Sequence, residues 1–126
     1  MAFETFEELE VWKLSRQLKK EIRALVKKFP FDEKYRLTDQ IIRSSRSNGS
    51  NIAEGFGRYH FKDNSKFGRI ARGSLFETLN HLIDAFDEEY ITGEELKYFR
   101  EKVLHCIKVL NGYIAYLERQ SNQITK

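Results

Sequence analysis

Apolar residues recur every three or four positions through most of the chain, which is the spacing of amphipathic α-helices. In the first segment they fall within about 120° of arc on a helical projection. This first apolar face comprises Val11, Leu14, Leu18, Ile22, Leu25, Val26 and Phe29. Thr5 and Glu8 have the spacing of a capping box, and Pro30 interrupts the pattern. The pattern therefore predicts a first helix over about residues 6–29.

A second helix is predicted over about residues 34–56. Gly55 and Gly57 follow its apolar positions and are expected to end it. Its middle, residues 44–50, is rich in serine and has poor intrinsic helix propensity. On propensity alone this stretch would be a loop, so a helix here requires packing to stabilise it.

A third helix is predicted over about residues 63–88, with Asp63, Asn64 or Ser65 as its N-cap. Ser74 and Thr78 interrupt its apolar face and indicate a close approach of helices. The residues expected on that face are Phe67, Ile70, Ala71, Ser74, Leu75, Thr78, Leu79, Leu82 and Phe86.

The fourth helix is predicted over residues 93–119, with a frayed tail at 120–126. Thr92 and Glu95 form a second capping-box pattern at its start. Four amphipathic helices with short links predict an all-α fold, an antiparallel up-down-up-down four-helix bundle in one domain, 1–126. The fourth helix also carries apolar residues outside its core face, namely Tyr98, Val109 and Tyr116. Together with Trp12 of the first helix, these are candidates for a subunit interface.

Two short strings carry a resemblance to a known family. They are residues 51–58 (NIAEGFGR) and 70–75 (IARGSL), preceded by Gln40 and Arg43. With these residues, the chain from Phe6 to about Leu117 resembles the four-helix-bundle proteins of 23S rRNA intervening sequences. That family also includes the accessory variability protein of diversity-generating retroelements. The resemblance implies a ring-shaped homo-oligomer, typically a pentamer, and a role in binding rather than in catalysis.

The sequence departs from this family in the second helix. Relatives usually carry apolar residues near positions 46 and 48 and often proline at 49, where this chain has Arg46, Asn48 and Gly49. Two alternatives follow: this face opens onto a pore, a groove or a neighbouring subunit, or the helix is locally weakened. The departure adds Arg46 to the possible phosphate contacts.

Composition limits the function classes. The 126 residues suit one domain, and no apolar run approaches the roughly 20 residues that span a bilayer. A lone cysteine, Cys106, lies in an apolar helical pattern and is expected to be a buried structural thiol. We therefore expect a cytoplasmic protein. The resemblance implies a bacterial protein, and no cofactor is expected.

The net charge is only +3, but the basic residues are unevenly placed. A stripe of cations lies within about 80° of arc along the first helix, beside its apolar face. These cations are Lys13, Arg16, Lys20, Arg23 and Lys27. The stripe is either a solvated helix face or a ridge that tracks the phosphates of a nucleic acid.

A second basic cluster contains Arg58, Lys62, Lys66, Arg69 and Arg72, with Tyr59 and Phe61 among them. Aromatic side chains between cations are typical of surfaces that bind unpaired bases. The alternative is that these aromatic residues close the end of the bundle. Residues 84–101, in contrast, carry seven acidic residues against Lys97 and Arg100.

Asn51 and Glu54 share a helix face, but no nucleophile, second carboxylate or metal ligand accompanies them. We expect a structural polar core instead, in which Glu54 pairs with Arg43 or Arg58, and Asn51 bonds the backbone or Gln40. The pairs Glu77/His81 and Glu101/His105 are a minor hypothesis for a metal site, and no further carboxylates complete it.

The expected function is therefore non-enzymatic. The resemblance implies a partner that is structured RNA or an RNA–protein complex, because relatives lie in ribosomal RNA genes or assist a reverse transcriptase through basic surfaces. The competing hypothesis is a protein-interaction scaffold or accessory subunit, for which the acidic region at 84–101 would bind a basic partner.

Overall fold

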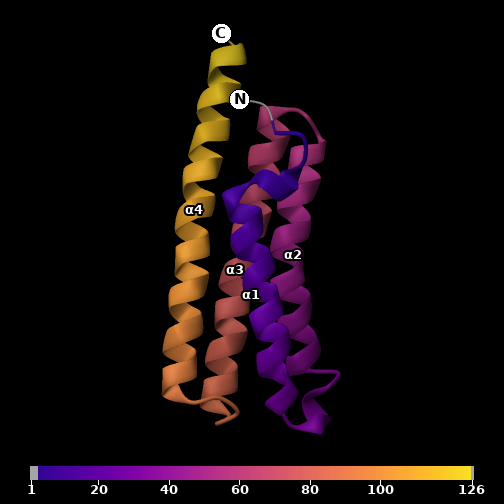
Figure 1. Ribbon diagram of the computed structural model, residues 1–126, viewed down its shortest axis with the longest axis vertical. Helices are drawn as coiled ribbons and strands as arrows, with labels where there is room; N and C mark the ends of the chain where they lie inside the picture. Colours follow the sequence, from indigo (N-terminus) through magenta and orange to yellow (C-terminus); the bar gives the residue numbers. More distant parts are fainter. Residues whose placement is uncertain (1–2, 126) are drawn as a thin grey trace.

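The computed structural model describes residues 3–125 and confirms the all-α fold. Its helices are η1 (Phe6–Glu8), α1 (Glu10–Leu25), η2 (Val26–Lys28), η3 (Phe31–Glu33), α2 (Leu37–Gly57), α3 (Phe61–Asp87) and α4 (Gly93–Thr125). The three η elements are single turns of 3₁₀ helix. The four α-helices lie side by side along the long axis of the molecule (Figure 1).

Neighbouring helices run antiparallel. On α2 and α3, Ser44 bonds Thr78 while Ser47 bonds Ser74, so residue numbers rise along one helix as they fall along the other. On α1 and α4, Glu21 pairs with Lys102 and Lys28 pairs with Glu95, which gives the same direction. Each helix therefore has two neighbours, and the order is up-down-up-down, as Figure 1 shows.

All four helices contribute to one hydrophobic core. Its fully buried members include Ile22 of α1, Ile41 of α2, Leu82 of α3 and Leu110 of α4. Burying a side chain of this size stabilises the fold by roughly 1.5–3 kcal/mol. The apolar face predicted for the first helix is confirmed, since all of its members are buried except Leu14, which is half-buried.

On α3 the predicted face is partly wrong. Ile70 and Phe86 are 45% and 40% exposed. The other predicted members are confirmed, since Ala71, Ser74, Leu75, Thr78 and Leu82 are buried and Phe67 and Leu79 are half-buried. Ile70 precedes Ala71 by one residue, which turns its side chain about 100° away from the core.

The first helix is interrupted where a continuous helix was predicted. Thr5 and Glu8 do form a capping box, but it caps η1. Leu9 then takes an extended conformation and buries its side chain, and α1 begins at Glu10. At the other end, the α-helical pattern tightens to 3₁₀ after Leu25, and Phe29 is extended, as the residue before a proline is expected to be.

The serine-rich stretch 44–50 is helical, so the packing around it overrides its poor propensity. The helix ends differently from our prediction, because the left-handed residue after α2 is Tyr59 (φ 58°) and neither nearby glycine has a positive φ. Gly55 serves close packing instead. A Cβ there would lie 2.8 Å from the Asn64 Oδ1 of α3.

Of the three predictions for the ends of α3 and α4, one is confirmed and two are wrong. Thr92 and Glu95 form the predicted capping box of α4, with backbone-to-side-chain bonds of 2.8 and 3.1 Å. The start of α3 is at Phe61, earlier than the three predicted caps, and His60 provides no side-chain cap. The tail predicted to fray is helical to Thr125, and Lys126 lies outside the described residues. Glu118–Gln120 are good helix formers that carry α4 onward along the start of α3.

Candidate nucleic-acid interface

The basic stripe of α1 and η2 lies on the surface. Lys13, Arg16, Lys20, Arg23 and Lys27 are all exposed. Within residues 3–125, none of these five cations takes part in an ion pair. The acidic Glu21 of the same helix is directed to α4, where it pairs with Lys102 and accepts a hydrogen bond from Tyr98. Glu7 lines a hollow together with Lys13, Arg16 and Lys20, but within residues 3–125 it forms no ion pair with them.

Part of this stripe lines a shallow groove between α1 and α2, which we call the basic groove. Its cations are Arg16, Lys19, Lys20 and Arg23 from α1 and Arg46 from α2. Its remaining lining is neutral and comprises Phe6, Trp12, Ser15, Ile42, Ser45, Gly49, Ser50 and Ala53. The groove lining therefore contains five cations and no carboxylate.

Lys19 is the groove residue that our sequence analysis missed. It follows Leu18 and lies 100° from Lys20 on a helical projection, outside the arc that defined the stripe. In the fold, Lys19 lines both parts of the groove. It lies with Arg16 and Arg46 in one part and again with Arg46 in the other. Arg46 could have indicated the role of Lys19 from the sequence. A cation on the facing helix shows which side of α1 borders a basic surface.

The unusual residues of α2 build this groove. Arg46 is exposed in the groove, whereas Asn48 beneath it is completely buried. Asn48 accepts a hydrogen bond from Ser15 and donates one to the Ser45 carbonyl at 2.7 Å. A Cβ at Gly49 would lie 2.9 Å from the Ser15 Oγ, so a residue without a side chain permits the close approach of α1 and α2. Of the three positions that depart from the family, Arg46 and Gly49 line a groove, as one alternative predicts, whereas Asn48 is buried.

Three members of the second cluster already have partners. Arg58 pairs with Glu54 at 3.1 Å, Arg69 pairs with Glu118 at 3.1 Å, and Arg72 donates to Asn111 at 2.8 Å. Lys62 and Lys66 are exposed on α3. Because two of its arginines are in ion pairs, this cluster presents less net charge than the basic groove.

The four residues predicted to form a structural polar core are not buried together, so this prediction is wrong. Gln40, Arg43 and Glu54 are exposed, and Asn51 is half-buried. Two of the expected bonds are nevertheless present, because Glu54 pairs with Arg58 and Asn51 donates to the Ser47 carbonyl at 2.8 Å. The physical reason is desolvation, which makes long charged side chains costly to bury without full compensation.

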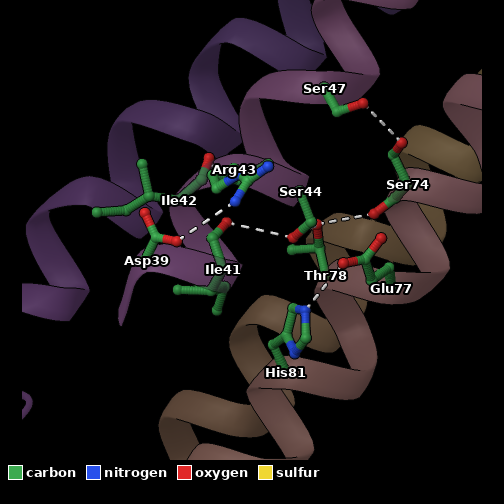
Figure 2. A network of polar contacts seen from close by, with 11 residues as sticks. Asp39, Ile41, Ile42, Arg43, Ser44, Ser47, Ser74, Glu77, Thr78 and His81 are labelled. Carbon is green, nitrogen blue, oxygen red and sulfur yellow. Dashed lines mark hydrogen bonds and ion pairs between the residues drawn. The ribbon is translucent and has the colours of Figure 1, made fainter. Parts of the chain in front are cut away.

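Small hydroxyls, most of them buried, line the contact of α2 with α3 (Figure 2). Ser44 and Thr78 bond each other at 2.8 Å, and Ser74 donates to Ser47 at 3.0 Å. Thr78 also donates to the Ser74 carbonyl at 2.9 Å. These hydroxyls satisfy one another and the helix backbone, which gives them a structural role.

His81 continues this contact, and its Nε2 lies 3.1 Å from the Glu77 carboxylate (Figure 2). Its Nδ1 is buried with no hydrogen-bond partner in the described chain. His105, from the other Glu/His pair, is exposed. Across residues 3–125, His, Cys, Asp and Glu side chains do not gather in a group of three that could hold a metal ion.

The four candidates for a subunit interface lie in different surroundings. Trp12 is half-buried in the basic groove, 5.0 Å from the ring of Phe6. Val109 packs partly against the core. Tyr98 and Tyr116 are 45% and 42% exposed, and their separation of 18 positions places them on one face of α4 about 27 Å apart.

Cys106 is buried, and this burial raises the pKa of its thiol to about 12. The thiolate required for nucleophilic chemistry is therefore scarce at neutral pH. None of the helices within residues 3–125 combines the length and hydropathy that crossing a bilayer requires.

The fold and its surface define a small four-helix-bundle protein with a basic groove between α1 and α2. Residues 7–112 match the 23S rRNA-intervening sequence protein family, and the chain belongs to that family. Among solved structures, the chain resembles a protein with unknown function from the S23 ribosomal protein family of Bacteroides thetaiotaomicron VPI-5482. That likeness has a TM-score of 0.77 and 27% sequence identity, and it covers 83% of this chain and 95% of the other. A comparison with curated proteins finds no significant match.

Proposed function

We propose that this protein is a non-enzymatic, self-associating bundle that binds structured RNA, or an RNA–protein complex, through the basic groove. The observation that carries the proposal is the set of five unpaired cations in a groove lining that contains no carboxylate. Four of them follow one another over about 10 Å of α1, and Lys13 and Lys27 extend the charge to about 21 Å. A ridge of this length can neutralise several phosphates together.

The family name supports a connection with ribosomal RNA, since it describes proteins of 23S rRNA intervening sequences. The absence of catalytic function is proposed on the chemistry of the candidate groups. Ser44 and Ser45 of α2 donate to the backbone carbonyls of Ile41 and Ile42, and Ser47 accepts a hydrogen bond from Ser74 of α3. The one thiol has a pKa raised by burial to about 12.

The test is fluorescence-anisotropy titration of a structured RNA hairpin across a salt series. Neutralising five phosphates should give a log–log slope of about four to five units, because each contributes about 0.9. Replacing Lys20 and Arg23 with Glu should abolish binding without lowering the melting temperature. The matched control replaces Lys97 and Arg100 of α4 with Glu, which gives the same charge change at the same spacing.

Equal loss of affinity in both double variants would mean that only net charge matters, and it would contradict a specific groove. No binding by the wild type at low salt would favour the second candidate function, a protein-interaction scaffold. The observation behind that alternative is the exposed acidic set around the α3–α4 link, Asp84, Asp87, Glu88, Glu89, Glu94 and Glu101.

Self-association is proposed on the exposed rings of Tyr98 and Tyr116 along α4. Sedimentation equilibrium should give a mass several times the 15.0 kDa of one chain, with five copies as the family resemblance implies. Replacing Tyr116 with Asp should shift the protein toward the monomer. A monomeric wild type at high concentration would overturn this part of the proposal.

A further inference from the structure

The link between α1 and α2 presents two aromatic rings to solvent. Phe31 and Tyr35 are each 82% exposed, more than any other large apolar residue of the described chain except Tyr59. A single exposed ring needs no explanation, but two in one short link are a surface feature. Neither residue belongs to the basic groove or to the second basic cluster.

A lysine lies between these rings. The Lys34 Nζ is 5.6 Å from the ring centroid of Phe31 and 5.4 Å from that of Tyr35, so one cation contacts both aromatic faces. Because both rings are so exposed, the faces that Lys34 does not cover remain open to solvent. Arg36, the next residue, is also exposed.

The link is held in place rather than left as a free loop. The Tyr90 hydroxyl donates to the Glu33 carboxylate at 2.7 Å, and the Leu37 amide donates to the other oxygen of that carboxylate at 3.4 Å. Backbone bonds join Lys34 to Phe31 at 3.0 Å and Arg36 to Glu33 at 2.9 Å. The rings are therefore presented on an ordered turn, which reduces the entropy lost on binding.

The position of the link connects it with the basic groove. It connects α1 to α2 at the lower end of the bundle in Figure 1, beyond Arg23 and Ile42, which are the groove residues nearest to it in the sequence. Lys27 is the last cation of the stripe and lies four residues before Phe31. A strand whose phosphates follow the groove would reach the two rings as it leaves the bundle.

We propose that Phe31 and Tyr35 form a stacking platform for unpaired bases that flank the structured part of a bound RNA. The inference rests on the proposed function and names its substrate class: a paired RNA element with a single-stranded extension. Bases offer an aromatic face whatever their sequence, and cations beside the rings hold the phosphates between them.

The experiment compares two RNAs in anisotropy titrations, a blunt hairpin and the same hairpin with a short unpaired uridine extension. The wild type should bind the extended hairpin about tenfold more tightly, the gain expected for one stacked base. The double variant F31A/Y35A should bind both RNAs with the affinity of the wild type for the blunt one. Its control is F76A, which removes a half-exposed ring from α3.

The outcomes distinguish this inference from the proposed function. Equal affinity of the wild type for both RNAs would overturn the platform and leave the groove intact, whereas no binding of either RNA would overturn both. Ultraviolet crosslinking of a bromouridine extension should label the link, and labelling elsewhere would overturn the platform. Binding of anionic vesicles that F31A/Y35A abolishes, without the RNA difference, would assign the rings to lipid instead.

Discussion

Ser15 of α1 donates a hydrogen bond to the side-chain oxygen of Asn48 in α2, at a point where both residues are almost completely buried. Asn48 in turn donates to the Ser45 carbonyl of its own helix. This polar contact fixes the axial register of α1 against α2. A shift of either helix along its axis would leave buried polar groups without partners. The alignment of the two helices that line the basic groove therefore depends on the Ser15–Asn48 pair.

Replacing Asn48 with Ala should lower the free energy of unfolding by about 1–3 kcal/mol, because the Ser15 hydroxyl would be left buried and unpaired. Urea denaturation measures the change, and Ser50→Ala at an exposed position of the same helix is the control. In a double-mutant cycle with Ser15→Ala, the coupling should be about 1 kcal/mol. Strict additivity of the two substitutions would show that the bond contributes nothing to stability.

Gly55 and Gly73 should respond in opposite directions to replacement by Ala. A Cβ at position 55 would lie 2.8 Å from the Asn64 Oδ1 and 2.9 Å from the Phe67 Cβ, whereas at position 73 it would meet nothing within 4 Å. Gly55→Ala should therefore cost about 1–3 kcal/mol through overpacking. Gly73→Ala should stabilise α3 by about 1 kcal/mol through helix propensity. Thermal or urea denaturation measures both changes in stability. Stabilisation by both substitutions would contradict the close contact at Gly55.

Arg46 should contribute to RNA binding while Arg43, one turn away, should not. Arg46 lines the basic groove, whereas Arg43 lies on the α3 side of α2 and pairs with Asp39 at 3.6 Å. Arg46→Glu should weaken binding of a structured RNA at least tenfold and reduce the salt slope by about one unit. If Arg43→Glu has the same effect in the anisotropy titration, the interface is wider than the groove.

Cys106 should be almost inert in the folded protein. Its burial raises the pKa of the thiol from 9.0 to about 12, which reduces the thiolate fraction at neutral pH about a thousandfold. Alkylation by iodoacetamide, followed by mass spectrometry, should therefore be far slower in buffer than in strong denaturant. Comparable rates under the two conditions would mean that α4 opens readily at this position.

The ion pair of Lys28 with Glu95 should give a measurable dependence of stability on pH. The hydrogen bond from Lys28, helped by the Thr92 amide, lowers the pKa of Glu95 below its usual 4.5. A lowered folded-state pKa gives stability that is present above pH 4.5 and is lost as pH falls through the folded value. Glu95→Gln should cost less than about 1 kcal/mol at neutral pH and should lose less stability on acidification than the wild type.

The control for this titration is Glu94→Gln, which removes an exposed carboxylate from the same helical turn. Denaturation at a series of acidic pH values should give parallel profiles for that variant and the wild type. If both variants flatten the profile equally, the effect comes from general charge repulsion.

The helices and the direction of the bundle could be predicted because apolar periodicity is a local property of the sequence. The two correct capping boxes, at Thr5 and Thr92, follow from spacing alone in the same way. The break at Leu9 could not be predicted, because it depends on a tertiary contact that buries this residue. The helical state of the serine-rich centre of α2 also depends on packing, and it was expected only from the resemblance.

The candidate interface was predictable on α1 but not across the groove. Exposure of the stripe from Lys13 to Lys27 follows from its position beside the apolar arc. The participation of Lys19 and the burial of Asn48 depend on how α1 and α2 are paired, which no single helix encodes. Glu54 and Arg43 were wrongly placed in a core, because a polar residue within a helical pattern does not show whether its surroundings can compensate its charge.

The hydroxyl contacts between α2 and α3 also determine when the chain can fold during its synthesis. The N-terminal half leaves the ribosome first, yet the centre of α2 has poor helix propensity and its Ser44 and Ser47 side chains pair with Thr78 and Ser74. Until α3 has emerged, α1 and α2 therefore lack both a core and partners for these polar groups. We expect the nascent chain to remain unfolded and open to chaperones until α3 has left the ribosome.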